Sequence, residues 1–256
     1  MAILEAFSLE GKHALVTGVS NTFGLCYGMA VALREAGARV ALLDISPAVH
    51  ELAESLGGSE NGYHSIQCDL CDADSLETAF RKASALFDGR LDILLNGAGL
   101  QYRNDALTFP ADKWKSIIDV NLSAMFFACQ AAAKIMDPRG SGKIINIASL
   151  TSYFGSRNIP AYAASKGGVM QLTKALSNEW AALGIQVNAI APGYMKTKLT
   201  ENLIDTDLGR LHTSRIPAGR WGESKDLMGA VVFLASGASD YISGAVIPVD
   251  GGYLGF

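Results

Sequence analysis

The sequence predicts a single-domain α/β fold in which a doubly wound, seven-stranded parallel sheet carries helices on both faces. Seven short apolar runs bounded by turns recur along the chain and are typical of buried strands. Longer helical patterns separate most of these runs, an alternation that produces parallel sheets. The chain has 256 residues, of which 49% are hydrophobic, so we expect one core and one domain over residues 1–256.

Composition and charge exclude several classes of function. The net charge is −4 and no basic run occurs, so nucleic acid is not expected as a partner. No apolar stretch reaches the ~20 residues of a membrane helix, and residues 1–12 lack the apolar core of a secretory signal, so we expect a cytoplasmic protein without membrane contact. Cys68 and Cys71 have CxxC spacing, but no second pair or histidine cluster completes a zinc site, so no metal is predicted.

The first strand, expected over residues 12–17, leads into a glycine-containing turn and then into a helix over 25–36. Gly18 and Gly24 border this turn, and glycine is needed where a Cβ would keep a ligand from the backbone. Backbone N–H groups at the start of the helix are then placed to hold a pyrophosphate. Thr22 stands where a middle glycine is expected, so an ordinary strand-to-helix turn is the alternative.

The second strand, expected over 38–43, ends in Asp44, about 20 residues beyond the glycines. A carboxylate at this place binds both hydroxyls of an adenosine ribose and repels a 2′-phosphate. The neighbouring Asn21 and Ile45 are not basic, so the sequence favours NAD over NADP. The alternative is that Asp44 only caps the helix that follows Pro47.

A helix over 74–87 connects the third and fourth strands, which are expected over 63–67 and 91–95. The fourth strand is followed by the small-residue segment Asn96-Gly97-Ala98-Gly99. Doubly wound sheets bind ligands near the point where the strand order reverses, and small residues there let a nucleotide approach closely. The alternative is a plain turn at the end of a strand.

Residues 110–136 predict one long helix, and Asn121 lies inside it although asparagine is a poor helix former. A polar residue in such an apolar run needs a partner or a function. The fifth strand, expected over 143–148, delivers Ser149 at its carboxyl end, which is the edge where the sites of α/β proteins lie.

The most informative pair is Tyr162 and Lys166, which stand one turn apart on a helix expected over 160–183. A free tyrosine has a pKa of roughly 10, and a fixed ammonium one turn away favours the phenolate. The phenol then becomes a usable general acid or base near neutral pH, and Ser149 could hold a substrate oxygen beside it. The alternative is that Tyr162 caps the start of the helix and Lys166 is a solvated surface residue.

The sixth strand, expected over 185–191, ends at Pro192-Gly193, and the seventh is expected over 245–249. Between them, residues 193–220 are polar and irregular, and a helix is expected over 226–235. Long segments of this kind often cover ligands, so residues 193–220 are predicted to form a lid.

Taken in order, these motifs resemble those of the short-chain dehydrogenase/reductase superfamily, and the resemblance covers essentially the whole chain. The pieces that carry it are Thr17-Gly18…Gly24, Asp69, Asn96-Gly97-Ala98-Gly99, Asn121, Ser149, Tyr162…Lys166 and Pro192-Gly193…Thr197. The resemblance implies a Rossmann fold. It also implies an oxidoreductase that interconverts a secondary alcohol and a ketone with a nicotinamide cofactor, which Asp44 leads us to expect to be NAD.

The resemblance implies a catalytic set of Asn121, Ser149, Tyr162 and Lys166. Tyr162 is expected to exchange a proton with the reacting oxygen while Ser149 holds that oxygen. Lys166 is expected to lower the pKa of Tyr162 and to bind the nicotinamide ribose. Asn121 is expected to hold a water that connects Lys166 to solvent.

The implied cofactor site spreads over the strand ends. Asp69 is expected to meet the adenine with Leu70 beside it, and Thr197 to meet the nicotinamide carboxamide. Thr22 and Gly97 replace a glycine and an asparagine of the family pattern, which leaves the cofactor affinity open. The full set expected to bind NAD is Gly18, Asn21, Phe23, Gly24, Asp44, Asp69, Leu70, Asn96, Gly97, Ala98, Tyr162, Lys166, Pro192, Gly193 and Thr197.

Within the superfamily, the chain resembles dehydrogenases of sugar acids and polyols. A carboxylate substrate needs a cation, and arginine binds carboxylates through two hydrogen bonds, so Arg103 and Arg157 are the first candidates, followed by His212 and Arg215 in the lid. The first hypothesis is a sugar-acid dehydrogenase, the second is an NAD-dependent dehydrogenase of a neutral polyol or ketose, and the third is a nucleotide-binding regulator without turnover. The resemblance also implies a homotetramer, with the helices 110–136 and 160–183 at one interface.

Overall fold

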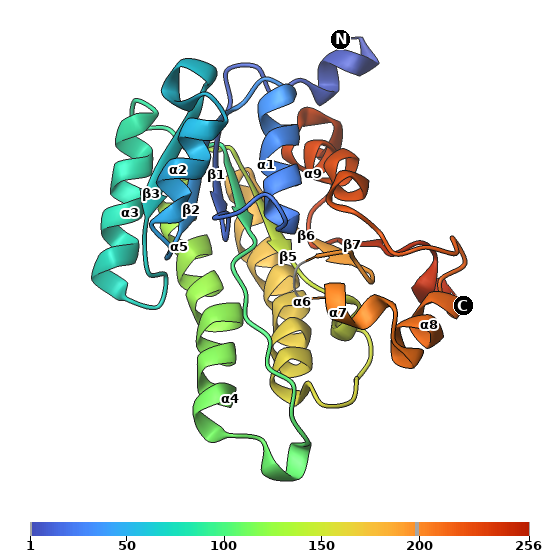
Figure 1. Cartoon of the computed structure of the whole chain (residues 1–256). Coiled ribbons are helices and arrows are strands. Elements are labelled where there is room, and N and C mark those ends of the chain that lie inside the picture. The colour runs from blue at the N-terminus through green and yellow to red at the C-terminus, as the bar shows by residue number, and fades with distance from the viewer. Residues whose placement is uncertain (1, 198–199, 256) are drawn as a thin grey trace.

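The computed structural model describes residues 2–197 and 200–255, so residues 1, 198, 199 and 256 of the predicted domain and lid lie outside it. In the described chain, seven parallel strands form one sheet in the order β3-β2-β1-β4-β5-β6-β7 (Figure 1). The predicted doubly wound fold is confirmed, with strand ends shifted by a residue or two from the predicted bounds. The strands are β1 (His13–Thr17), β2 (Arg39–Asp44), β3 (Tyr63–Gln67), β4 (Ile93–Asn96), β5 (Gly142–Ile147), β6 (Ile185–Pro192) and β7 (Val246–Val249).

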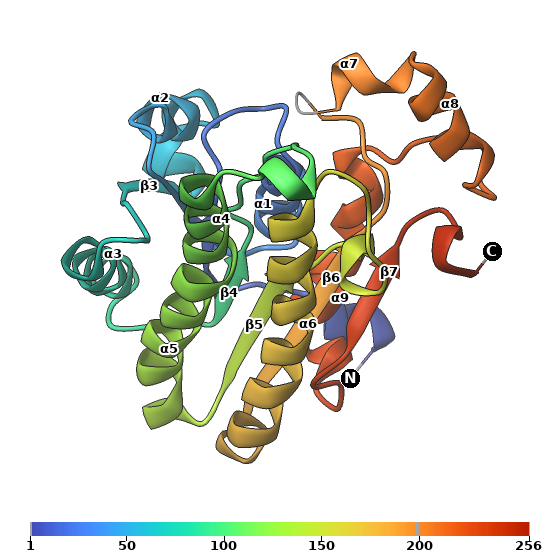
Figure 2. The ribbon, with the colours of Figure 1, turned by 90° about the horizontal axis from the view of Figure 1, so that it is seen from below.

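Helices cover both faces of the sheet, as Figures 1 and 2 show. One face carries α1 (Leu25–Glu35), α2 (Ala48–Ser55) and α9 (Met228–Ala235), and the other carries α3 (Ala73–Leu86), α5 (Met125–Met136) and α6 (Pro160–Trp180). The strand order reverses between β1 and β4. Open sheets of this kind leave a crevice at that point, outside the carboxyl ends of the strands.

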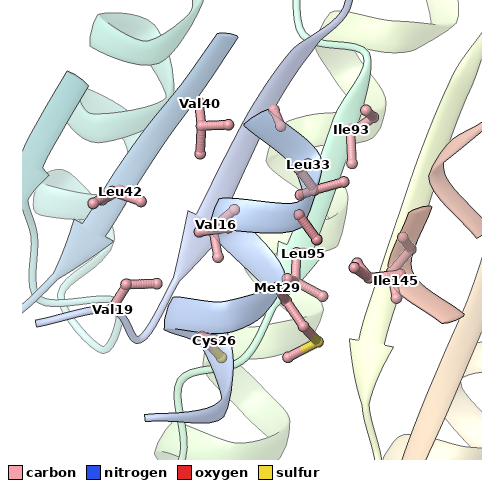
Figure 3. Close-up of a cluster of buried hydrophobic side chains, with 14 of the residues drawn as sticks. Val16, Val19, Cys26, Met29, Leu33, Val40, Leu42, Ile93, Leu95 and Ile145 are labelled. Atoms are coloured by element: carbon pink, nitrogen blue, oxygen red, sulfur yellow. The ribbon is translucent and has the colours of Figure 1, made fainter. Parts of the chain in front are cut away.

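A buried cluster holds α1 to the sheet beside the predicted glycine turn (Figure 3). Met29 and Leu33 of α1 lie together with Val16 of β1 and Leu95 of β4, and all four side chains are fully buried. Burying one such side chain stabilises the fold by roughly 1.5–3 kcal/mol. The ends of β1 and β4 are thereby fixed next to the start of α1.

The long helix predicted over 110–136 is continuous but changes its winding in the middle. α4 (Ala111–Ile118) passes into a π-helical segment, Asp119–Ala124, and then into α5. Asn121 lies in this segment and is fully buried. π turns are rare in proteins as a whole, but those that occur are often found at functional sites. The π turn at Asn121 therefore marks this residue as a candidate for a functional role.

One helical stretch of the described residues, Ala111–Arg139, is by length and composition long and apolar enough to cross a membrane. The prediction that no stretch meets this test is therefore wrong. Within its most apolar window 44% of the residues are buried, and Ala128, Ala132 and Met136 pack in the core. A core helix of a globular domain has the same length and composition, and this helix covers one face of the sheet.

The segment predicted as an irregular lid contains two short helices, α7 (Glu201–Ile204) and α8 (Asp207–Ser214). Thr206 caps α8, because its hydroxyl accepts a hydrogen bond from the Gly209 N–H at 3.1 Å. The prediction of irregular structure is therefore wrong for α7 and α8. The segment is polar because these short helices are largely exposed to solvent.

Candidate active site

A cavity of about 560 Å³ opens at the carboxyl edge of the sheet, next to the switch point between β1 and β4. Residues that follow β1 through β6 line it, together with residues of the lid. Asn96, Asn121 and Arg157 are predicted site residues that do not line it. The predicted residues that it brings together are Gly18, Asn21, Phe23, Gly24, Asp44, Asp69, Leu70, Gly97, Ala98, Arg103, Ser149, Tyr162, Lys166, Pro192, Gly193 and Thr197.

The glycine turn is held against the end of β4. Gly18 has a φ of +78°, and a Cβ on it would lie 2.6 Å from the backbone nitrogen of Ala98, so a side chain has no room there. The hydroxyl of Thr17 accepts hydrogen bonds from the backbone N–H groups of Gly97 at 3.1 Å and Ala98 at 3.3 Å. Thr17, a residue without a predicted role, therefore ties together the two strand ends that form the switch point.

The two departures from the family pattern have different settings. A Cβ on Gly97 would overlap the sulfur of Cys26, which lies at the start of α1 and also lines the cavity. The thiol thus fills the space beside Gly97, and burial raises the pKa of Cys26 to about 12, so it is an inert packing group. Thr22 is exposed and lies outside the cavity lining.

Two carboxylates stand in the part of the cavity that β2 and β3 form. Asp44 Oδ1 accepts a hydrogen bond from the Ser46 N–H at 2.9 Å, and Asp69 Oδ1 accepts one from the Cys71 N–H at 2.9 Å. These bonds orient each carboxylate and leave the other oxygen of each for a ligand. Over residues 2–197 and 200–255, no group of three His, Cys, Asp or Glu side chains is placed to hold a metal ion.

Lys166 is buried within the site. It projects from α6, which begins with Pro160, a favourable first residue for a helix. Its Nζ donates a hydrogen bond to the Ile147 carbonyl at 2.6 Å and lies 5.7 Å from the centre of the Tyr162 ring. Burial lowers the pKa of Lys166 to about 8, so its ammonium gives up a proton far more easily than an exposed lysine does.

The acidity of Tyr162 differs from the prediction. Burial raises the pKa of Tyr162 above its ordinary value, while the Ser149 hydroxyl and the positive charge of Arg103 act in the opposite direction. The predicted lowering of this pKa by Lys166 is not among these effects. In the free protein the Lys166 ammonium donates its hydrogen bond to the Ile147 carbonyl.

Asn121 fastens the segment that follows Gly99 to the helix of Tyr162. Its Oδ1 accepts a hydrogen bond from the Leu100 N–H at 2.7 Å, and its Nδ2 donates to the Leu100 carbonyl at 2.9 Å. Nδ2 also donates to the hydroxyl of Ser165 at 3.1 Å, and Ser165 lies on α6 next to Lys166. The buried amide therefore keeps the end of β4 and the start of α6 at a fixed separation.

Two predicted binding residues lie elsewhere in the structure. Asn96 is the last residue of β4, and its Nδ2 donates to Asn146 Oδ1 at 3.0 Å and to Cys129 Sγ at 3.1 Å. Side chains alternate along a strand, and this one is buried in the core, so the Asn96 side chain serves core hydrogen bonds and the predicted cofactor contact of this residue stays a prediction. Arg157 is exposed in the loop before α6 and has no place in the cavity wall.

The far end of the cavity combines Arg103 with residues of the lid. Arg103 influences the pKa values of Tyr162, Tyr194 and His212, so its charge lies near all three. Tyr194 directly follows the Pro192-Gly193 motif, which is the signal that could have identified it. Thr200 is a further residue without a predicted role, and its hydroxyl accepts a hydrogen bond from the Thr197 N–H at 3.0 Å.

Comparison with known proteins assigns the chain to a class. A family model described as enoyl-(acyl carrier protein) reductase matches residues 18–254. Together with the sheet and the cavity, this match shows that the chain belongs to the short-chain dehydrogenase/reductase family. It is therefore an oxidoreductase of the kind that works with a nicotinamide dinucleotide, as the resemblance predicts.

Individual relatives are dehydrogenases of sugar acids. The 2-dehydro-3-deoxy-D-gluconate 5-dehydrogenase of Escherichia coli is 47% identical over 98% of this chain and 99% of that protein. A putative 2-deoxy-D-gluconate 3-dehydrogenase from Agrobacterium tumefaciens, solved with bound NADP, has a TM-score of 0.88 at 44% identity and covers 98% of this chain and 99% of its own. A gluconate 5-dehydrogenase from Burkholderia cenocepacia, solved with NADP and tartrate, has a TM-score of 0.94 at 38% identity and covers 99% of both chains. The predicted likeness to such enzymes is confirmed.

Proposed function

We propose that the chain is an NAD(H)-dependent dehydrogenase that interconverts a secondary alcohol and a ketone on a sugar acid. The observation that carries this proposal is the convergence of Ser149, Tyr162, Lys166 and Arg103 in one cavity. A hydroxyl, a phenol and an ammonium serve proton exchange with a carbonyl, and a guanidinium binds a carboxylate. The identity with the Escherichia coli 2-dehydro-3-deoxy-D-gluconate 5-dehydrogenase supports the same substrate class.

The residues of the cavity fit a nicotinamide dinucleotide. Gly18 lets the turn pack directly on the backbone of Ala98, and Asn21, Phe23 and Gly24 continue the turn along the cavity wall to the start of α1, where backbone N–H groups would hold the pyrophosphate. Asp69 with Leu70 would hold the adenine, and Thr197 would hold the nicotinamide carboxamide. When bound, the nicotinamide supplies or accepts a hydride at the substrate carbon.

Tyr162 is the proposed general acid in reduction and general base in oxidation. Its raised pKa keeps the phenol protonated, which suits donation of a proton to a carbonyl oxygen. Ser149 would hold the same oxygen by a hydrogen bond, and Lys166 would bind the ribose. Asn121 would keep these groups in register and carry the water that connects Lys166 to solvent.

The proposed cofactor is NAD, although the two solved relatives above hold NADP. Asp44 is the reason, because one of its oxygens is free for the ribose hydroxyls and its charge opposes a 2′-phosphate. The neighbouring Ile45 offers no cation, and the basic residues in the described cavity wall are Arg103, Lys166 and His212.

An acid substrate is the proposed preference because Arg103 lies within electrostatic reach of Tyr162. The solved Burkholderia cenocepacia relative holds tartrate, a hydroxy acid, in its complex. A neutral polyol or ketose is the second candidate, and the exposure of Arg103 favours it, since water weakens an exposed cation. The regulator without turnover loses its support, because Thr22 stands outside the cavity and Cys26 compensates for Gly97.

A homotetramer is proposed from the resemblance. Trp114 of α4 and Phe127 of α5 support it, because these large apolar side chains are 42% and 52% exposed on the helical face away from the sheet.

The decisive experiment follows absorbance of NADH and NADPH with a panel of keto-sugar acids and matched neutral ketoses. Turnover of acids with NADH, at a kcat/KM at least about tenfold above that with NADPH, is the expected result. Turnover of neutral ketoses alone would transfer the assignment to a polyol or ketose dehydrogenase. An Asp44→Asn variant should lose most of the preference for NADH, and preference for NADPH in the parent chain would overturn the NAD assignment.

A further inference from the structure

The side chain of His212, in the lid, has no role in the function proposed above. His212 of α8 lines the same cavity as Ser149, Tyr162 and Arg103. Its ring is stacked on that of Tyr194, with 4.2 Å between the ring centres and 21° between the planes. A histidine on the exposed face of a polar helix would be free to move in solvent. The stack on Tyr194 instead holds the His212 ring in the cavity wall.

The stack is anchored from several elements. The ring of Tyr194 also packs on Tyr253 of the C-terminal segment at 5.3 Å, and the Arg215 guanidinium lies 4.9 Å from the centre of that Tyr253 ring. Thr213, next to His212, accepts a hydrogen bond from Nε1 of the buried Trp221 at 2.8 Å. Contacts from the β6 end, the lid and the C-terminal segment therefore hold α8 with its histidine toward the cavity.

The histidine has an unused hydrogen-bonding group. Its Nδ1 is shielded from solvent and has no hydrogen-bond partner among the residues that the structure describes. A shielded nitrogen without a partner costs free energy, which a ligand atom can recover. A half turn about χ2 exchanges the two edges of the ring and preserves the stack on Tyr194, so either nitrogen can be turned to the cavity.

The charges around the ring indicate which ligand would suit it. The positive charges of Arg103, in the segment after β4, and of Arg215, at the end of α8, act on the ring, and the aromatic ring of Tyr194 covers one of its faces. Burial and these two arginines lower the pKa of His212, so the ring is neutral at pH 7 in the free protein. An anion placed beside Arg103 would reverse this effect and favour a proton on the imidazole.

We propose that His212 binds the carboxylate of the acid substrate opposite Arg103, so that the lid itself recognises the acid. This inference rests on the proposed function and adds a specificity residue on α8. The carboxylate then accepts hydrogen bonds from the guanidinium on one side and the imidazole on the other. A neutral sugar leaves His212 without its partner, which makes α8 the element that distinguishes acids from polyols.

Two variants test the proposal with the full-length enzyme. His212→Phe keeps an aromatic ring on Tyr194 and removes both nitrogens, and His212→Gln keeps a hydrogen-bond donor without a titrating charge. With saturating NADH, KM for a keto-sugar acid should rise roughly tenfold in His212→Phe and less in His212→Gln, while KM for the matched neutral ketose changes less than about twofold. His50→Phe on the exposed surface of α2 is the control and should change neither constant.

The pH profile supplies a readout that lost packing alone would not change. In the parent enzyme KM for the acid should rise as the pH is raised from 6 to 8, about the ordinary range of histidine, because binding takes up a proton on His212. This rise should be absent in both His212 variants and with the neutral ketose. Equal effects of His212→Phe on acid and neutral substrates would overturn the inference, as would an unchanged acid KM.

The two levels of the proposal fail in different ways. A parent enzyme that turns over neutral ketoses alone would overturn both the sugar-acid function and the role of His212. A parent enzyme that prefers acids, and loses that preference in Arg103→Ala while keeping it in His212→Phe, would overturn the role of His212 alone.

Discussion

The two ends of the cavity are built in different ways. The nucleotide end consists of strand ends and the turns that follow them, held by backbone hydrogen bonds and by close contacts such as that of Gly18 with Ala98. The substrate end consists of Arg103 on a connecting segment and of lid residues held by side-chain packing, such as the stack of His212 on Tyr194.

The difference assigns separate tasks to the two ends. Strand ends of a sheet that is packed between two layers of helices cannot move without disturbing the core, so the nucleotide end is suited to a part of the reaction shared by a whole family. Loop and lid residues can change without that penalty, so the substrate end is suited to specificity. Tyr162 lines the cavity together with residues of both ends, and its loss should stop proton exchange with the substrate while leaving nucleotide binding intact.

The largest expected effect is that of Tyr162→Phe. Removing the phenolic proton should lower kcat by roughly 10²–10⁴-fold, because a positioned general acid contributes about that much. The Kd of NADH, measured by fluorescence titration, should change little. Tyr241→Phe, at a fully exposed tyrosine, is the matched control. Full activity of Tyr162→Phe would contradict the assigned role.

At the substrate end, Arg103→Ala should raise KM for a sugar acid by about 10–100-fold, since a hydrogen bond to a charged group contributes about 1.5–3 kcal/mol. KM for a neutral ketose and the Kd of NADH should stay within about twofold. Arg157→Ala removes an exposed arginine outside the cavity and should leave all three constants unchanged. If KM rises equally for acid and neutral substrates, Arg103 does not bind the carboxylate.

At the nucleotide end, Gly97→Asn should weaken the binding of NADH and leave the preference for acid over neutral substrates unchanged. The new side chain meets the Cys26 sulfur, and overpacking of this kind costs about 1–3 kcal/mol, so we expect a lower melting temperature and a weaker affinity for NADH. The ratio of activity with acid and neutral substrates should not change. Adding Cys26→Gly to Gly97→Asn should restore most of both losses. A double variant no better than the single one would show that the two sites are independent.

The smallest expected effect concerns the pH dependence of stability. The pKa of Lys166 is about 8 in the folded protein, against 10.5 for an unperturbed lysine. Between these values the unfolded chain binds more protons than the folded one, so the free energy of unfolding should rise with pH. Relative to Lys166→Met, the parent chain should therefore gain stability from pH 8 to about pH 10 in urea titrations without cofactor.

The exposed Lys174 on the same helix supplies the control, and the difference between the parent chain and Lys174→Met should not change over this range. The same flat result for Lys166→Met would show that the lysine keeps its ordinary acidity in the fold.

Sequence patterns alone predict the sheet, the switch point and most of the residues that line the nucleotide end of the cavity. Apolar runs such as residues 38–43 must be buried wherever they form strands, and parallel strands bring their carboxyl ends to one edge. Motifs that follow the strands, such as Gly18 and Asp44, therefore come together whatever the details of packing. The spacing of Tyr162 and Lys166 on one helix likewise follows from helical geometry alone.

The contacts between side chains of different elements could not be predicted from these patterns and follow from the three-dimensional packing. The side chain of Asn96 points into the core and donates a hydrogen bond to Asn146. Asn121 lies in a π-helical segment and bonds to the backbone of Leu100. Cys26 fills the space beside Gly97, and His212 is stacked on Tyr194. Local pattern carries no record of such pairs, because the partners are distant in sequence and meet only when separate elements pack in three dimensions.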